Sequence, residues 1–453
     1  MFIVQLWDVY TMRERTLIKD LNKHIDQYVL VAGWMHRLRI LGKLGFLLLR
    51  DSTGFVQCVL NAQQIDSIKH LQVESVLSIR GYVIKKPDKE GLEVHVSEIE
   101  VISPVLDQVP VEINKDSLDA HLDTIIDHRP VTLRHEKQKA IFKVQAGILT
   151  AFRNAMIEEG FIEFRSPVLM GAPSESGASV FEVKYYDHKA YLAQSPQVYK
   201  QIMVGVFERV FTITPVFRAE KHNTTRHLME ITQMDGEVGF IEDYDECLEI
   251  IERVVRKIFN HLDNNYSKEL QLWNTTLPQL PASRFPKVKV KEALQIIEKK
   301  AGKSAQRPEL DLDPQDERLI AEWALEEYGS DFLWILNFKK DKNFYTRNNP
   351  EDPDESLSFD LVCRGLEWLS GTHRIHDYNK LVENMKNQGL TLEYYEHYLE
   401  AFKYGIPYEA GFSFGLERMT QQIFRLKNIR EAVLFPSDLD RIAGQRISKH
   451  KTV

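Results

Sequence analysis

The chain has 453 residues, of which 43% are hydrophobic and 27% charged, an ordinary balance for a soluble globular protein. This length predicts roughly two to three domains. A net charge of -8 excludes a chain that is basic throughout, although a local basic patch could still bind nucleic acid. Three separated cysteines favour reduced thiols over disulfides or a structural zinc site. Apolar runs are too short for a secretory signal or a membrane span, so we expect a soluble cytoplasmic protein.

Residues 28–102 contain five runs rich in alternating and β-branched side chains, which predict five strands. A helix-like stretch at 62–71 falls between the third and fourth runs. This order predicts a five-stranded barrel of the OB type, although another small barrel or a sandwich would give a similar pattern. We assign the barrel domain, with an N-terminal helical extension, to residues 1–103.

An irregular acidic stretch with prolines follows the barrel, and residues 104–130 are expected to form a linker or hinge. The second domain, 131–453, begins with an amphipathic helical pattern that ends near Gly160. Strand-like runs then alternate with helices. The predicted fold class is therefore α+β, with a mostly antiparallel sheet flanked by helices.

Two strand-like runs, 209–217 and 231–240, flank the turn-forming stretch "EKHNTT" and predict an antiparallel hairpin. Arg218 and Glu220 lie at the mouth of this hairpin. The planar fork of an arginine there can bind a phosphate or a carboxylate, but a surface ion pair would give the same pattern.

Two further stretches carry residues that could bind a ligand. In "AGFSFGLERM" (410–419), two glycines in a strand would let a ligand approach the backbone, and Arg418 follows on a helix. In "SFDLVCRGLEWLSGTHRIH" (358–376), Asp360 and Glu367 could hold Mg²⁺ beside a bound polyphosphate, and Arg374 could bind an anionic substrate. A solvated charged face is the alternative for the second stretch, although its flanking residues are apolar.

Together these stretches resemble the class II aminoacyl-tRNA synthetases (subclass b). "FRAE" with "RHLMEI" is similar to motif 2 of that class, "GFSFGLER" to motif 3, and "GFIEFRSPVL" to motif 1. "SESGASVF", "YLAQSPQVYKQ" and "RGLEWLSGTHRIH" resemble the aspartyl-tRNA synthetases of the archaeal and eukaryotic type. The resemblance implies an OB-fold anticodon-binding domain at 1–103, a class II catalytic domain at 131–453, and a homodimer whose interface includes motif 1.

The resemblance also implies a reaction and roles for named residues. ATP would activate L-aspartate as an adenylate, and the aspartyl group would then pass to the 3′-terminal adenosine of tRNA-Asp, with tRNA-Asn as a further acceptor. Arg218 would bind the α-phosphate and the attacking carboxylate, Glu220 the adenine amino group, and Mg²⁺ would lie on Asp360 and Glu367. His227 and Arg418 would bind the outer phosphates.

By the same resemblance, Lys200 and Arg374 would flank the side-chain carboxylate of aspartate. The substrate site would also include Glu175, Gln197 and Ser370, the first two near the α-amino group. The side-chain carboxylate of aspartate would pair with both cations, whereas the amide of asparagine would leave them partly unpaired. Loss of one partner from a desolvated charge pair typically costs ~2–5 kcal/mol, so such a site favours aspartate.

In the barrel, Phe46, Gln57 and Glu93 match anticodon contacts of the family, by stacking and by hydrogen bonds to base edges. Phe46 could equally be a core residue of the barrel. His36 resembles the enzymes that charge both tRNA-Asp and tRNA-Asn, whereas Lys89 aligns with a lysine typical of strict enzymes. The balance favours relaxed recognition.

Some positions depart from the family pattern, namely Ser413, Ser437 and Ile231. These departures bear on ATP affinity and keep other functions open. The alternatives are an asparaginyl-tRNA synthetase, and a synthetase paralogue with an RNA-binding, regulatory or non-tRNA ligase role. The motif arginines favour activity, and the barrel argues against a ligase that ignores tRNA.

Overall fold

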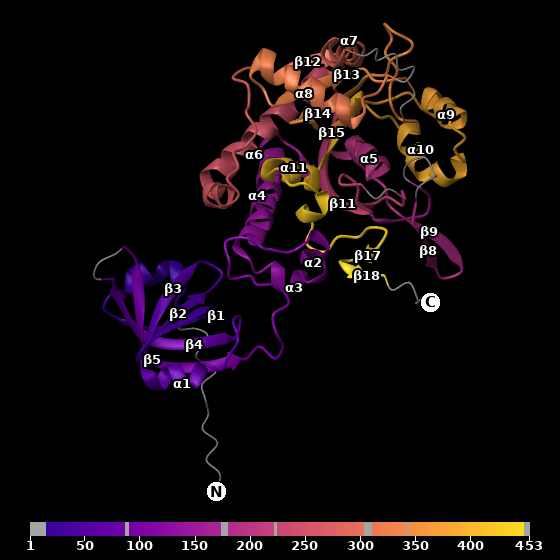
Figure 1. Ribbon diagram of the computed structural model, residues 1–453. Helices are drawn as coiled ribbons and strands as arrows, with labels where there is room; N and C mark the ends of the chain where they lie inside the picture. Colours follow the sequence, from indigo (N-terminus) through magenta and orange to yellow (C-terminus); the bar gives the residue numbers. More distant parts are fainter. Residues whose placement is uncertain are drawn as a thin grey trace. The chain divides into compact units, whose positions relative to one another are not determined.

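The computed structural model describes residues 15–86, 90–173, 180–221, 224–302, 310–340 and 343–447. The chain forms two compact units, residues 1–120 and 121–453 (Figure 1). The boundary falls inside the stretch 104–130 that was expected to be a linker. Residues 121–130 of that stretch belong to the second unit and contain α2 (Leu122–Asp127) and the start of α3 (Arg129–Thr132).

The first unit is a closed barrel with the strand order β1-β2-β3-β5-β4, which confirms the predicted OB fold. A short 3-10 helix, Ile18–His24, precedes the barrel where a helical extension was expected. In β2, β3 and β4 buried and less buried side chains largely alternate, because successive residues of a strand point to opposite faces. The elements are β1 (Tyr28–Leu41), β2 (Leu44–Arg50), β3 (Phe55–Leu60), α1 (Ala62–Ile68), β4 (Val76–Lys85) and β5 (Leu92–Ser103).

The helix α1 follows β3, as the sequence predicted. Asn61 accepts a hydrogen bond from the backbone amide of Gln64, and the Gln64 side chain accepts one from the backbone amide of Asn61. This reciprocal cap fixes the start of the helix. Ile65 and Ile68 then point into the barrel core.

The second unit is built on an eight-stranded sheet that is mostly antiparallel, as predicted. Its outer pairs, β12 with β13 and β10 with β6, run parallel. In spatial order the strands are β12 (Lys287–Lys289), β13 (Phe332–Leu336), β14 (Ser358–Cys363), β15 (Leu366–His373), β16 (Glu409–Gly415), β11 (Glu230–Gly239), β10 (Arg209–Phe217) and β6 (Ile162–Glu163).

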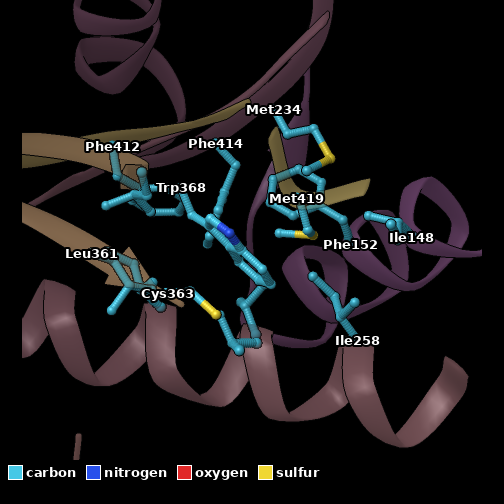
Figure 2. Packing of buried hydrophobic residues seen from close by; sticks show 14 of the residues in the cluster. Ile148, Phe152, Met234, Ile258, Leu361, Cys363, Trp368, Phe412, Phe414 and Met419 are labelled. Carbon is cyan, nitrogen blue, oxygen red and sulfur yellow. The ribbon is translucent and has the colours of Figure 1, made fainter. Parts of the chain in front are cut away.

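Helices cover the apolar face of this sheet. Figure 2 shows Met234, Phe412 and Phe414 of the sheet among side chains from α4 (Glu136–Glu158), α6 (Tyr244–Leu272) and α11 (Leu416–Phe424). Phe152 of α4 meets Phe211 and Phe414 edge to face, with ring centroids 5.9 and 6.1 Å apart. These large apolar side chains form the main core and leave the opposite face of the sheet for polar groups.

The remaining elements surround the sheet. The helix pair α7 and α8 packs beside β12 and β13 over a second apolar cluster, and α5, α9 and α10 enclose a third. These elements are α2 (Leu122–Asp127), α3 (Arg129–Thr132), α5 (Gln197–Phe207), α7 (Val290–Ala301), α8 (Pro314–Tyr328), α9 (Tyr378–Asn387), α10 (Glu396–Lys403), 3-10 turns at Leu392–Tyr395 and Ile429–Ala432, and the short strands β7 (Leu169–Met170), β8 (Glu182–Tyr185), β9 (His188–Leu192), β17 (Arg441–Ile442) and β18 (Gln445–Arg446).

Within the described part of the chain, none of the helices combines the length and the apolar character that a membrane span requires.

Candidate active site

A cavity of about 350 Å³ opens on the polar face of the eight-stranded sheet. Most of the residues proposed from sequence to bind ATP or an amino acid line it, although they come from distant parts of the chain. They are Gln197, Lys200, Arg218, Glu220, His227, Glu367, Ser370, Arg374 and Arg418. Glu175, which was expected here, lies outside the described residues.

Strand register brings the polar side chains to one face. Asp235 of β11 pairs with Ser413 of β16, Ser413 with Ser370 of β15, and Ser370 with Asp360 of β14. Directly opposed residues of antiparallel strands point to the same face, so these four side chains form a row across the sheet. Asp360 is buried and ends this row next to the cavity without lining it.

One end of the cavity holds a buried cluster of two cations and two carboxylates. Lys200 of α5 lies 3.0 Å from Asp235 and 3.2 Å from Glu237. Arg374, just beyond β15, donates to both oxygens of Glu237 at 2.6 and 3.1 Å. All four side chains are at most 3% exposed, so each charge depends on its partners instead of water.

The pKa values follow from this geometry. Burial alone would raise the pKa of Glu237, but the positive charges of Arg374 and Lys200 outweigh burial and hold it below the ordinary value. Burial would lower the pKa of Arg374, but the Glu237 carboxylate raises it above its usual range. The Glu237–Arg374 pair therefore favours its ionised form, and the formal charges of the four residues sum to zero.

Gly411 makes room for this cluster. It pairs with Glu237 across β16 and β11, and a Cβ at Gly411 would lie 1.7 Å from a carboxylate oxygen of Glu237. The sequence predicted that a glycine in this strand lets a ligand approach the backbone. The structure shows that Gly411 accommodates a side chain of the protein itself, because Glu237 occupies the space above it.

The other end of the cavity carries the motif 2 and motif 3 arginines. The Arg218 side chain reaches the cavity, and its Nε is buried without a hydrogen-bond partner among the described residues. Arg418 of α11 lies 3.1 Å from a carboxylate oxygen of Glu367. The Nδ1 of His227 and the hydroxyl of Thr224 form a hydrogen bond of 2.6 Å, in which the tautomer of the ring sets the donor. A buried guanidinium nitrogen without a partner can be satisfied by an anionic ligand.

Arg226, next to His227, also reaches this end of the cavity and forms an ion pair with Glu317 of α8. Burial raises the pKa of Glu317, and the positive charge of Arg226 opposes that effect. The pair attaches the loop after β10 to the start of α8. Arg226 begins the stretch "RHLMEI", which resembles motif 2. Nothing in the sequence indicates that Glu317 is its partner, because 91 residues separate the two in the chain.

Sequence reasoning also missed Gln233, Asp235 and Glu237, all on β11. A signal was present, since these polar residues alternate with Met234, Gly236 and Val238 along the strand. All of them are buried. Alternating polar residues in a strand buried on both faces indicate a polar pocket on one of those faces.

Two departures from the family pattern have structural explanations. The Ser413 hydroxyl donates a hydrogen bond to Asp235 at 2.6 Å, so it holds the carboxylate that pairs with Lys200. The Ser437 hydroxyl accepts a hydrogen bond from the backbone amide of Ala443 at 3.1 Å. Ile231, the third departure, lines the cavity.

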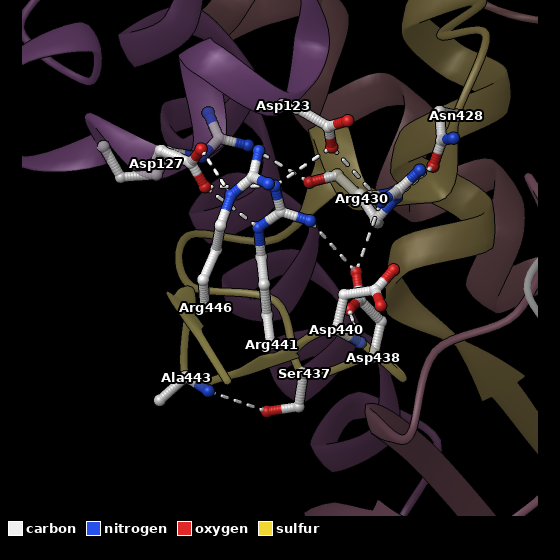
Figure 3. Close-up of polar contacts among 11 residues, drawn as sticks. Asp123, Asp127, Asn428, Arg430, Ser437, Asp438, Asp440, Arg441, Ala443 and Arg446 are labelled. Atoms are coloured by element: carbon white, nitrogen blue, oxygen red, sulfur yellow. Dashed lines mark hydrogen bonds and ion pairs between the residues drawn. The ribbon is translucent and has the colours of Figure 1, made fainter. Parts of the chain in front are cut away.

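A C-terminal segment supports the motif 2 hairpin. The Ser437 carbonyl accepts a hydrogen bond from the Met229 amide at 3.1 Å, and the Thr225 carbonyl accepts one from the Ile429 amide at 2.9 Å. Figure 3 shows how this segment is anchored, with Arg441 bound to Asp123 and Asp127 of α2 at 3.0 Å each. Arg441 is buried, whereas its partners Asp123 and Asp127 remain 56% and 26% exposed.

The residues expected to contact an anticodon lie on the first unit. Gln57 of β3 pairs with Glu93 of β5 and donates a hydrogen bond to its carboxylate at 2.8 Å. Phe46 of β2 pairs with Val59, which lies two residues beyond Gln57 on β3. Phe46 is only partly buried, which fits an outward stacking surface better than a core position. The ring centroids of His36 and Phe55 are 4.8 Å apart. Lys89 lies outside the described residues.

Glu417, at the start of α11, also faces the cavity. Both of its carboxylate oxygens accept the backbone amide of Thr232 at 3.1 Å. Burial raises its pKa from the ordinary 4.5 to about 7, because the hydrogen bonds only partly compensate for lost hydration. Glu417 is therefore part protonated near neutral pH.

This pKa predicts a pH-dependent stability. Between pH 4.5 and about 7 the folded protein keeps a proton on Glu417 that the unfolded chain releases, so stability falls as the pH rises. Glu417→Gln removes this effect. The stability of the variant relative to wild type should rise by about 2.4 kcal/mol from pH 5 to pH 7.5, at ~1.36 kcal/mol per unit of proton linkage. Urea unfolding at both pH values measures it, with exposed Glu400→Gln as control; an unchanged difference would contradict the assigned pKa.

Comparisons with known proteins agree with this geometry. Residues 121–439 match the family model of tRNA synthetases class II (D, K and N), and residues 29–102 match that of the OB-fold nucleic acid binding domain. The aspartate–tRNA(Asp/Asn) ligase of Thermus thermophilus is 41% identical over 94% of this chain and 99% of its own length. The aspartate–tRNA(Asp) ligase of Thermococcus kodakarensis is 38% identical over 94% and 98%.

Solved structures give the same result. The asparaginyl-tRNA synthetase of Pyrococcus horikoshii complexed with asparaginyl-adenylate has a TM-score of 0.83 and 30% identity, and covers 96% of this chain and 99% of its own. Both domains and the full length are therefore matched. The chain belongs to the class II aminoacyl-tRNA synthetases of the D, K and N group, and within it to the aspartyl-tRNA synthetases of the archaeal and eukaryotic type.

Proposed function

We propose that this protein is an aspartate–tRNA ligase, which activates L-aspartate with ATP and transfers it to tRNA. The observation that carries this proposal is the arrangement of one cavity, with Lys200 and Arg374 at one end and Arg218 and Arg418 at the other. Its sequence relatives that are aspartate–tRNA ligases match nearly the whole chain, which supports the same activity.

The charge of the amino-acid end supports aspartate as the substrate. Lys200 and Arg374 already balance Asp235 and Glu237, so the substrate's side-chain carboxylate would join a neutral cluster and share both cations. Its ammonium group would lie near the carboxylates. Asparagine would bring no negative charge to the two cations, so it would form weaker hydrogen bonds with them than the charged side chain of aspartate does.

At the nucleotide end, we assign Arg218 to the α-phosphate and to the attacking carboxylate of aspartate. Charge develops on the α-phosphate as pyrophosphate leaves, and a fixed guanidinium stabilises that charge without reorganising. Glu220 would accept from the adenine amino group, and His227 and Arg418 would bind the outer phosphates. Transfer to the ribose hydroxyl of tRNA then needs mainly correct positioning.

Mg²⁺ is part of the proposal, with Asp360 and Glu367 as the residues that would hold it. Among the described residues, no three His, Cys, Asp or Glu side chains converge on a metal site. A pair of carboxylates fits Mg²⁺ nonetheless, because this ion commonly takes one or two carboxylates and completes its shell with phosphates and water. When bound, it would neutralise phosphate charge.

The activation step gives the test of this function. Wild-type protein should catalyse ATP–pyrophosphate exchange with aspartate and much less with asparagine or lysine. Arg218→Ala should lower that exchange ~10²–10³-fold, the effect of losing one donor to a developing charge. Lys299→Ala, which removes an exposed cation of α7, is the matched control.

Three outcomes of the exchange assay would contradict parts of the proposal. Near-normal exchange in a folded Arg218→Ala protein would refute the motif 2 assignment. Better activation of asparagine by the wild type would instead favour an asparaginyl-tRNA synthetase. Absence of exchange with every amino acid, with and without tRNA, would favour a paralogue with an RNA-binding, regulatory or other ligase role.

We infer that the protein is a homodimer. The strand β6, from motif 1, is an edge strand of the sheet in the described part of the chain, and Ile162 on it is exposed. Ile157, at the end of α4, and Phe207, at the end of α5, are exposed as well. Apolar side chains around an open sheet edge fit a protein interface, and sedimentation equilibrium would show whether the protein is a monomer.

For tRNA choice we propose relaxed recognition, in which both tRNA-Asp and tRNA-Asn are charged. His36 supports this, because an imidazole beside Phe55 leaves more room for either pyrimidine than an indole would. Relatives of both types are similar to this chain, the Asp/Asn ligase of Thermus thermophilus and the Asp ligase of Thermococcus kodakarensis, so overall similarity does not decide the matter.

Charging of the two purified tRNA transcripts at fixed salt tests this proposal. The preference for tRNA-Asp should stay below ~100-fold, about 2.7 kcal/mol. His36→Trp should increase the preference, because a bulkier ring narrows the site, while the same change at exposed His70 should leave it unaltered. A wild-type preference beyond that limit would show a strict enzyme.

A further inference from the structure

Behind the amino-acid end of the cavity lies a chain of buried hydrogen bonds that the proposed reaction does not use. Gln201 of α5 donates from its Nε2 to the Oε1 of Glu409 at 2.6 Å. The Oε1 of Gln201 accepts from the Nε2 of Gln197 at 2.9 Å and from the hydroxyl of Tyr398 at 2.9 Å. All four side chains are buried, and Gln197 also lines the cavity.

These bonds determine the orientation of both side-chain amides. An amide oxygen only accepts and an amide nitrogen only donates, so the two donors that meet Gln201 fix its oxygen toward them. Its nitrogen must then face an acceptor, and Glu409 supplies that acceptor. Gln197 uses its nitrogen on Gln201, which leaves the oxygen of Gln197 as the end of the amide that can accept from a ligand.

Glu409 ends this chain of bonds. Its side-chain partner is the amide of Gln201, while Lys200 and Arg374 pair with Asp235 and Glu237. Burial, and then the negative charge of Glu237, raise the pKa of Glu409 well above its ordinary value. With or without a proton, a carboxyl group has an oxygen that accepts, and the Oε1 of Glu409 accepts from Gln201.

We propose that Glu409 is a positioning residue for the amino-acid substrate, which acts through Gln201 to hold the oxygen of Gln197 toward the substrate's ammonium group. The inference rests on the proposed function, since it concerns the same site. An ammonium group only donates, so it needs an acceptor there. With Glu409 absent, either amide could reverse and present its nitrogen to the ammonium group.

Three variants separate this role from a merely structural one. Glu409→Gln keeps the shape and an acceptor oxygen, whereas Glu409→Leu removes the acceptor. Gln201→Met leaves Glu409 in place but breaks the link to Gln197. Exposed Glu400→Leu on α10 is the matched control for Glu409→Leu.

The KM values for aspartate and ATP and the kcat are measured by ATP–pyrophosphate exchange, and thermal unfolding reports the fold. In Glu409→Leu and Gln201→Met, the aspartate KM should rise ~10-fold, the effect of one hydrogen bond of ~1.4 kcal/mol. The ATP KM and kcat should stay within ~3-fold of wild type. Glu409→Gln and Glu400→Leu should resemble wild type in all three.

The outcomes separate this inference from the proposed function. If wild-type protein shows no exchange with aspartate, the proposed function fails, and the inference fails with it. If wild type is active but both Glu409→Leu and Gln201→Met keep the normal aspartate KM, the inference alone is wrong. It is also wrong if Glu409→Gln is as impaired as Glu409→Leu, or if the ATP KM rises equally. Should Glu409→Leu not fold, Gln201→Met decides the question.

Discussion

Lys200, Arg374, Asp235 and Glu237 are buried together, and the amino-acid end of the cavity depends on their mutual pairing. Removing any one of them would leave the buried cluster with one uncompensated charge, a change that typically costs ~3–5 kcal/mol. The pairing also holds both cations in fixed positions before a substrate arrives. A substrate carboxylate therefore meets donors that are already oriented, which is the condition for strong discrimination by charge.

The sheet makes this cluster possible. Its apolar face packs Met234, Phe412 and Phe414 against α4, α6 and α11, and this core fixes the strands. The same strands carry Asp235, Glu237 and Ser413 on their other face, because side chains alternate along a strand. The register of β11 with β16 thus aligns the core on one side and the site on the other, and a slip by one residue would exchange them.

Beside this cluster, Gln201 links Gln197 to Glu409, so polar positioning extends from the cavity into the interior. At the nucleotide end the support differs. Ion pairs such as Arg226 with Glu317 and Arg418 with Glu367 are only partly buried. Phosphates could exchange with these carboxylates at lower cost, since partly solvated pairs contribute less than buried ones. The structure thus combines a rigid amino-acid end with a more adaptable phosphate end.

The sequence by itself determined the barrel, the mostly antiparallel sheet and the residue types at the motif positions. Alternation and helical periodicity are local, and the motif arginines Arg218 and Arg418 could be recognised from short stretches. Only the tertiary structure decided which charges meet. Arg374 lies 137 residues from Glu237, and Gln201 lies 208 from Glu409. Strand order and register place these pairs in contact, and neither can be read from a local pattern, because pairing between distant strands depends on how the whole chain packs.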